Sequence, residues 1–186
     1  TLDREGLAED TIVAFTSDNG PLLDGPLARY NGPFRGQKGD SLEGGIRVPC
    51  LVRYPGRIPA GSESGHLVHF CDYLPTLAGL AGVPLPHEGI LDGYDVTCRL
   101  RGDPGEVPDA RFWQRNRYAP VSRCNAAMRD GRWKLLWPMH RGADDKDPDD
   151  GAFYRHGLRS AHWLMDVNPD LPDREIGPPV PAELYD

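Results

Sequence analysis

The stretch Thr11–Gly20, TIVAFTSDNG, decides the fold class of this 186-residue chain. Its first half, Thr11–Phe15, is a short, continuous apolar run, which predicts a strand buried on both faces of a sheet. Polar residues follow that run directly, among them Asp18 and Asn19. Because the carboxyl ends of strands in an α/β sheet open onto the ligand crevice, Asp18 and Asn19 are the first candidate site residues.

Two further segments extend this α/β pattern. Val48–Tyr54 is typical of a second strand, which the following Pro-Gly pair ends. We expect a helix after Asp72, which can cap its first turn, and Gly82 marks the end of that helix. One face of the helix is expected to pack on the sheet, and its apolar residues are Leu74, Leu77, Ala78 and Ala81.

The pattern changes after Gly102. Asn125–Arg129 and Arg132–Trp137 flank Asp130-Gly131, which is a two-residue hairpin signal. We therefore predict two parts: an α/β part with parallel strands over residues 1–102, and a smaller antiparallel α+β part over residues 103–186.

Charge and hydropathy exclude two classes of partner. The net charge of −7 leaves no global positive field that would hold nucleic acid or an anionic membrane. No apolar run approaches the roughly 20 residues that a membrane-spanning helix needs. An anionic ligand must therefore be bound by local groups.

The four cysteines, Cys50, Cys71, Cys98 and Cys124, lie far apart in the sequence and form no C-x-x-C pair. This spacing argues against a zinc ribbon or a thioredoxin-type motif. Buried free thiols are favoured over a disulfide, because Cys50 and Cys71 lie inside apolar runs.

The chemistry of the candidate site begins with Asp18 and Asn19. Their carboxylate and amide oxygens are hard ligands of the kind that calcium or magnesium prefers. On its own, an Asp-Asn-Gly triplet is more often a turn.

A second motif, Arg35–Asp40, places glycines on either side of Lys38, so that the backbone can come close to an anion that the ammonium group binds. A solvated surface lysine is the alternative. The segment Glu43–Pro49 joins this loop to the next strand, and its paired glycines fit a tight turn with positive φ.

Four segments in this order, TSDNG, RGQKGDSLEGGIRVP, VRYPGRIPAG and FCDYLPTLAGLAG, resemble the sulfatase family. The resemblance is strong over residues 7–102 and weaker through AAMRDGRWKLLW and the closing ELYD. It implies part of a doubly wound, alkaline-phosphatase-like mixed α/β sheet, followed by a small antiparallel sheet with a helix. It also implies one bound Ca²⁺ ion and a formylglycine nucleophile.

The resemblance assigns roles to individual residues. Asp18 and Asn19 match metal ligands, Lys38 matches the lysine that contacts the sulfate group, and Asp18 could also accept a proton from the nucleophile. Motif positions that would brace the loop beneath Lys38 are Glu43, Gly44, Gly45 and Arg47. Asp72 is interpreted as structural, because its capping role accounts for it.

The family's nucleophile motif, C-x-P-S-R or its serine version, does not occur in the chain. We expect it upstream of Thr1, so that the chain is the carboxy-terminal portion of a sulfatase, cut at both ends and inactive by itself. The implied substrate is a sulfated small molecule or carbohydrate. Export from the cell is usual in the family, so a secreted or periplasmic location is favoured.

Two rival functions stay open. Phosphodiesterases and phosphonate monoester hydrolases of the same superfamily usually place His after the strand-end Asp, so Asn19 favours sulfate chemistry. The other rival is an inactive chain that acts only as a binding module.

Two other segments carry weaker signals. The acidic stretch 144–151 is interpreted as a solvated loop, because its glycine comes one position late for a calcium loop. A second segment carries an aromatic and cationic group, which consists of Trp113, Arg115, Arg117 and Tyr118. Recognition of a sugar or aryl group would account for these residues, but packing accounts for them equally well.

Overall fold

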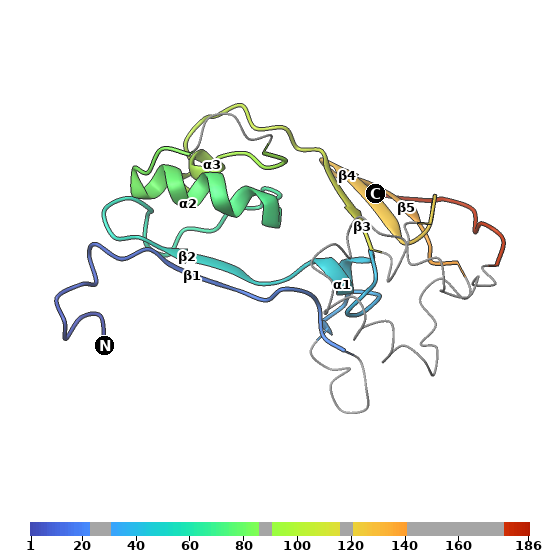
Figure 1. Cartoon of the computed structure of the whole chain (residues 1–186), viewed down its shortest axis with the longest axis horizontal. Helices are drawn as coiled ribbons and strands as arrows, with labels where there is room; N and C mark the ends of the chain where they lie inside the picture. The colour runs from blue at the N-terminus through green and yellow to red at the C-terminus, as the bar shows by residue number, and fades with distance from the viewer. Residues whose placement is uncertain (23–30, 86–90, 116–120, 141–176) are drawn as a thin grey trace, which may run out of the picture. The chain divides into compact units, whose positions relative to one another are not determined.

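The computed structural model describes residues 1–22, 31–85, 91–115, 121–140 and 177–186. They form two compact units (Figure 1). The first comprises Thr1–Gly20, Arg47–Arg111 and Arg129–Arg132; the second comprises Pro21–Ile46, Phe112–Met128 and Trp133–Asp186. The boundary expected at residue 102 stays a prediction, and residues 21–46, which carry Lys38, group with the second unit.

The first unit contains a two-stranded ribbon of β1 (Val13–Thr16) and β2 (Cys50–Arg53). Both strands lie where the sequence predicts them, but they pair antiparallel, with Phe15 opposite Leu51. The expectation of parallel strands is therefore wrong for this pair.

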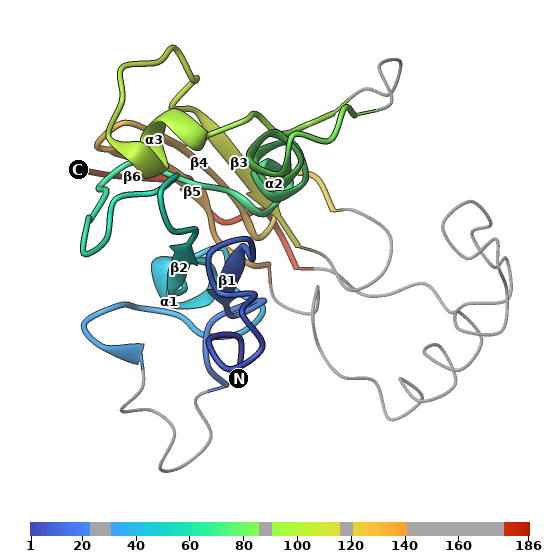
Figure 2. The ribbon, with the colours of Figure 1, turned by 90° about the vertical axis from the view of Figure 1, so that its left-hand side faces the viewer.

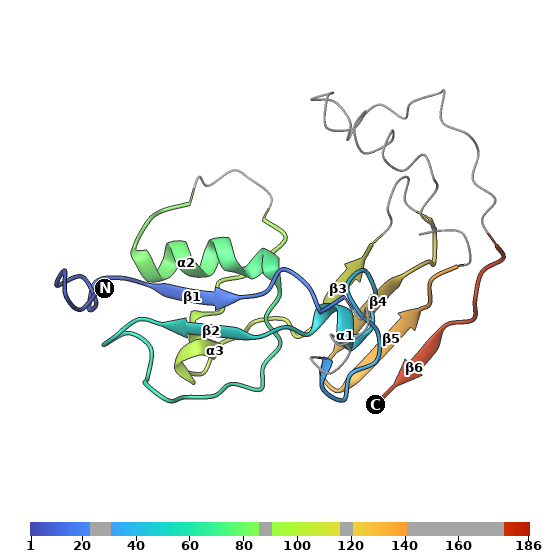
Figure 3. The ribbon, with the colours of Figure 1, turned by 90° about the horizontal axis from the view of Figure 1, so that it is seen from below.

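Helix α2 (Tyr73–Ala81) lies along one face of this ribbon, as Figures 1 and 3 show. A small apolar cavity between them is lined by Ala14 and Val52 from the ribbon and by Leu77 from the helix. The opposite face carries Val13, Phe15 and Leu51, which are 38%, 64% and 58% exposed. The prediction that this strand is buried on both faces therefore fails for the described residues.

Helix α2 ends at Gly82, as predicted, and Gly82 takes the left-handed φ of 67°. Its buried face, however, differs from the predicted one: Pro75, Thr76 and Leu80 are buried, whereas Leu74 is 59% exposed. A polar contact accounts for the different buried face, because the Thr76 hydroxyl accepts a hydrogen bond from the Val96 N–H at 3.0 Å. That bond turns Thr76 toward the extended segment before α3 (Thr97–Arg101).

Asp72 is fully buried and its side chain does not cap α2, contrary to the sequence prediction. Its carboxylate accepts hydrogen bonds from the N–H of His69 at 2.8 Å and the N–H of Tyr94 at 2.9 Å. It also forms an ion pair with Arg111 at 3.2 Å. The His69 bond is half of a capping box for the 3-10 helix η2 (Phe70–Asp72). Asp72 is thus structural, by a different set of contacts from the one expected.

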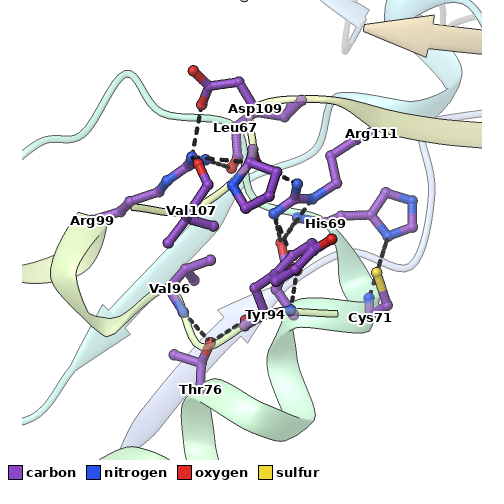
Figure 4. Close-up of polar contacts among 12 residues, drawn as sticks. Leu67, His69, Cys71, Thr76, Tyr94, Val96, Arg99, Val107, Asp109 and Arg111 are labelled. Carbon is purple, nitrogen blue, oxygen red and sulfur yellow. Dashed lines mark hydrogen bonds and ion pairs between the residues drawn. The ribbon is translucent and has the colours of Figure 1, made fainter. Parts of the chain in front are cut away.

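Two buried arginines connect the loops around this carboxylate. Figure 4 shows the Arg111 guanidinium over the Tyr94 ring, 4.9 Å from its centre. Arg99 of α3 donates to the Leu67 carbonyl at 2.7 Å and pairs with Asp109 at 2.7 Å (Figure 4). The first unit is therefore held together by charge-assisted hydrogen bonds as well as by apolar contacts.

The second unit contains the short helix α1 (Glu43–Ile46) and most of a four-stranded sheet of order β3-β4-β5-β6 (Figure 2). The strands are β3 (Arg111–Gln114), β4 (Ala126–Asp130), β5 (Trp133–Trp137) and β6 (Glu183–Tyr185). The predicted hairpin is present, with its turn one residue later, at Gly131-Arg132. Strand β6 pairs antiparallel with β5, and Leu184 lies opposite Leu135.

All four cysteines are free thiols, as the spacing favours, but only Cys124 is buried. Burial raises the pKa of the Cys71 thiol, and the neighbouring Asp72 carboxylate raises it further. Among the described helices, none has the length and apolar character needed to cross a lipid bilayer.

The buried ion pair provides a test of the first unit. We expect Asp72→Ala to lower the free energy of unfolding by about 3–5 kcal/mol, because it leaves the Arg111 charge buried without its partner. Denaturant titration followed by circular dichroism measures this change. The matched control is Leu74→Ala on the exposed side of α2, for which we expect a change within about 0.5 kcal/mol. Equal stability of the two variants would contradict the structural role of Asp72.

Candidate functional site

Asp18 and Asn19 lie at a bend directly after β1. The Ser17 hydroxyl donates to the Asn19 carbonyl at 2.8 Å, which fixes this bend. Asp18 is exposed and Asn19 is half-buried, so both side chains are accessible to a ligand.

The donor chemistry of this bend fits a hard cation. The two side chains supply one carboxylate and one amide oxygen, part of the roughly 6–8 oxygens that Ca²⁺ takes. No cluster of three or more His, Cys, Asp or Glu side chains that could hold a metal occurs in the described part of the chain. Asp18 and Asn19 therefore fit calcium as part of a ligand set.

Lys38 lies at the tip of a tight turn in the second unit. The Asp40 N–H donates to the Gln37 carbonyl at 2.9 Å, and the Gln37 N–H donates to the Asp40 carboxylate at 2.9 Å. Gly39, at the third position of the turn, has a φ of 98°, a conformation that side chains rarely adopt. The Lys38 N–H donates to the Pro21 carbonyl at 2.9 Å, and Lys38 itself is exposed. The turn thus presents the lysine to solvent from a fixed backbone.

Helix α1 packs on this loop through the backbone of its two glycines. A Cβ on Gly44 would lie 2.3 Å from the Gly36 carbonyl oxygen, and a Cβ on Gly45 would lie 2.1 Å from that of Asp40. Neither glycine of α1 has a positive φ, so the predicted tight turn is wrong. The paired glycines are needed for close approach instead.

Glu43 at the start of α1 binds Lys134 of β5. The Lys134 ammonium lies 2.9 Å from the Glu43 carboxylate, and the Lys134 side chain is only 8% exposed. Gly44 and Gly45 thus lie against the Lys38 loop itself, whereas Glu43 connects α1 to β5. The sequence offered no signal for Lys134 as the partner of Glu43.

Asn31 is a second residue that sequence reasoning missed. It is buried, and its side-chain amide donates to the carbonyls of Phe34, at 2.6 Å, and Gly36. These bonds hold the start of the loop that leads to Lys38.

Asn125 is a third. It is 3% exposed and has a φ of 42°. Its side chain binds two residues of the Lys38 loop, Gly39 and Ser41, at 2.7 and 2.8 Å. The sequence suggested only that it begins a strand.

Arg115 also lies at this turn. A guanidinium nitrogen of Arg115 lies 3.0 Å from the position that a Cβ on Gly39 would take. The other members of the aromatic and cationic group divide: Trp113 is half-buried in β3, whereas Arg117 and Tyr118 lie outside the described residues. The acidic stretch 144–151 lies outside them as well.

The structure therefore describes the candidate site in two parts. Lys38 and the three residues that brace its loop, Glu43, Gly44 and Gly45, come together in the second unit. Asp18 and Asn19 are adjacent in the first unit. Arg47 also belongs to the first unit, and is exposed one residue after α1 ends.

Comparison with known proteins relates this chain to sulfatases. A family model described as Sulfatase matches residues 1–83. Human (Homo sapiens) arylsulfatase A is 36% identical over 169 residues, which cover 89% of this chain and 33% of that protein. The chain spans about a fifth to a third of the length of the curated relatives it matches.

Two solved structures resemble this chain in fold. The PsFucS1 sulfatase from a Pseudoalteromonas species is 30% identical, with a TM-score of 0.56 over 76% of this chain and 28% of that one. Ps i-CgsB, solved in complex with k-i-k-neocarrahexaose, is 27% identical, with a TM-score of 0.57 over 82% of this chain and 35% of that one. The fold is thus mixed α/β of the alkaline-phosphatase type, with a small antiparallel sheet.

The close approach at α1 can be tested directly. We expect Gly44→Ala to weaken the packing of α1 on the loop by about 1–3 kcal/mol, because the added methyl group overlaps a carbonyl oxygen. Hydrogen exchange of the amides in residues 35–46 measures the loss. Gly65→Ala is the matched control, because nothing lies within 4 Å of its added Cβ. Unchanged protection in Gly44→Ala would contradict the close approach.

Proposed function

We propose that this chain is a member of the sulfatase family and forms the carboxy-terminal portion of an enzyme that hydrolyses a sulfate ester. The family model covers residues 1–83, and arylsulfatase A matches well beyond that stretch. The proposal concerns the longer protein. The chain itself supplies only part of the catalytic machinery.

The observation that carries the proposal is the presentation of Lys38. Its ammonium is exposed at the tip of a turn whose backbone is bonded to Pro21 on one side and to Asn125 on the other. A cation held by such a turn stabilises negative charge on sulfuryl oxygens without reorganising during the reaction. We assign to Lys38 the role of binding the sulfate group and stabilising that charge.

Asp18 and Asn19 supply the second part of the machinery. Their oxygens would hold a calcium ion, which when bound would supply positive charge to the sulfate oxygens. We also assign to the Asp18 carboxylate the acceptance of a proton from the nucleophile. The nucleophile, a formylglycine, is proposed to come from outside this chain, because the chain contains no C-x-P-S-R motif.

The proposed substrate is a sulfated carbohydrate or sulfated small molecule. The complex of Ps i-CgsB with a carrageenan-type hexaose supports the carbohydrate class. Asn19, in place of a histidine, supports sulfate over phosphate chemistry.

Lys38 provides the main test of function. In the full-length protein, we expect Lys38→Ala to lower kcat for a sulfate ester by about 100-fold or more, because the developing anion loses its fixed counter-charge. Turnover of 4-nitrophenyl sulfate measures the loss, and bis(4-nitrophenyl) phosphate, a phosphodiester, is assayed alongside it. Arg4→Ala, which removes an exposed cation from the first unit, is the control and should keep parental turnover. Parental turnover by Lys38→Ala would refute the assignment, and a preference for the phosphate ester would favour the phosphodiesterase alternative.

Calcium binding provides a second test. We expect the isolated chain to bind Ca²⁺ only weakly, because Asp18 and Asn19 supply two of roughly 6–8 oxygen ligands. Isothermal titration calorimetry measures the affinity, with Asp18→Ala as the control that should abolish the remaining heat. A micromolar Kd would mean that the chain holds further ligands.

A further inference from the structure

We propose that Asn125 is the positioning residue that holds Lys38 in its working geometry. The proposal rests on the proposed function, in which Lys38 binds the sulfate group. Asn125 lies between β3 and β4, far from the Lys38 loop in sequence. Its side chain bonds that loop on the carboxyl side of Lys38.

The Asn125 carboxamide is fully engaged. Its Nδ2 donates to the carbonyls of Gly39, at 2.7 Å, and Arg115, at 3.0 Å. Its Oδ1 accepts from the N–H of Ser41 at 2.8 Å. One amide group therefore binds the residues on both sides of Asp40 and ties them to the end of β3.

The partners of this group require an amide. The two carbonyls can only accept and the Ser41 N–H can only donate, so the site needs two donors and one acceptor on one short side chain. An aspartate would keep the bond to Ser41 but place its second oxygen against two carbonyl oxygens. A glycine would leave all three backbone groups without this partner.

The backbone of Asn125 is bound as well. It adopts a φ of 42°, in the left-handed region that asparagine tolerates better than most residues. Its carbonyl accepts from the Ser41 hydroxyl at 2.7 Å and from the Arg115 N–H at 3.1 Å. A conformation of this kind persists only where the surroundings fix it, and here they fix it against the Lys38 loop.

The consequence for Lys38 follows from chain connectivity. Gly39 is its direct neighbour, and the Lys38 N–H is bonded to Pro21, so the turn is held on both sides of the lysine. Without the Asn125 amide, only the Pro21 side of that restraint stays. Displacement of a catalytic group by about 1 Å can reduce the rate by about 100-fold.

The kinetic test uses Asn125→Gly and Asn125→Asp in the full-length protein. Glycine accepts the left-handed backbone and removes only the amide, whereas aspartate keeps size and shape but loses both donors. We expect each to lower kcat for 4-nitrophenyl sulfate by about 10- to 100-fold, with KM changed less than about threefold. Arg123→Gly is the matched control, since Arg123 is the other non-glycine residue of positive φ in the described chain, and its kcat should stay parental.

A double-mutant cycle with Lys38→Ala separates positioning from general structure. If Asn125 acts through Lys38, Asn125→Gly lowers kcat no further on the Lys38→Ala background. An equal fall on both backgrounds would show a general structural effect and overturn the proposal. Parental kcat in both Asn125 variants, with Lys38→Ala inactive, would overturn it too and leave the proposed function standing. Parental kcat in Lys38→Ala would instead overturn the proposed function, and this inference with it.

Hydrogen exchange tests the clamp without any activity. In the chain itself, we expect the Ser41 amide to exchange at least about tenfold faster in Asn125→Gly than in the parent, with the β5 amides unchanged. The Arg123→Gly control should exchange like the parent at Ser41. Unchanged exchange at Ser41 in Asn125→Gly would overturn the proposal even if the kinetic variants prove hard to fold.

Discussion

The second unit depends on the absence of side chains at Gly44 and Gly45. Their backbones lie so close to the carbonyls of Gly36 and Asp40 that no methyl group fits between them. A helix as short as α1 has little stability of its own, so this contact and the Glu43–Lys134 ion pair define its position. The loop that carries Lys38 in turn lies against α1. The conformation of the lysine turn thus follows from the smallest residues in the motif.

The two acidic residues that stand out in the first unit have opposite environments. Asp72 is fully buried and bound by two N–H groups and a guanidinium, so it is closed to a ligand. Asp18 is exposed at a strand end, beside an amide side chain. Burial and complete hydrogen bonding indicate a structural role for Asp72. Exposure beside a second oxygen ligand suits Asp18 to binding a cation.

Local signals predicted much of the fold and the residues at the centre of the candidate site. The apolar runs located β1 and β2, Gly82 marked the end of α2, and the closing ELYD forms β6. The buried face of α2 was not predictable, because it is set by a hydrogen bond that Thr76 accepts from the Val96 N–H, 20 residues away. The roles of Asn125 and Lys134 were hidden for the same reason. Asn125 depends on a partner 84 residues away and Lys134 on one 91 residues away, and no pattern within a short window of sequence reports such a contact.

The long-range bonds of the second unit also set the order in which its parts can fold. Ser41 and Asn125 are 84 residues apart, and Glu43 and Lys134 are 91 residues apart. Closing such long loops is slow relative to local folding, and a chain is synthesised from its amino end. A nascent chain therefore carries Lys38 well before the hairpin that fixes its turn has emerged. The turn that carries Lys38 therefore gains its final geometry only once residues 125–134 have been synthesised.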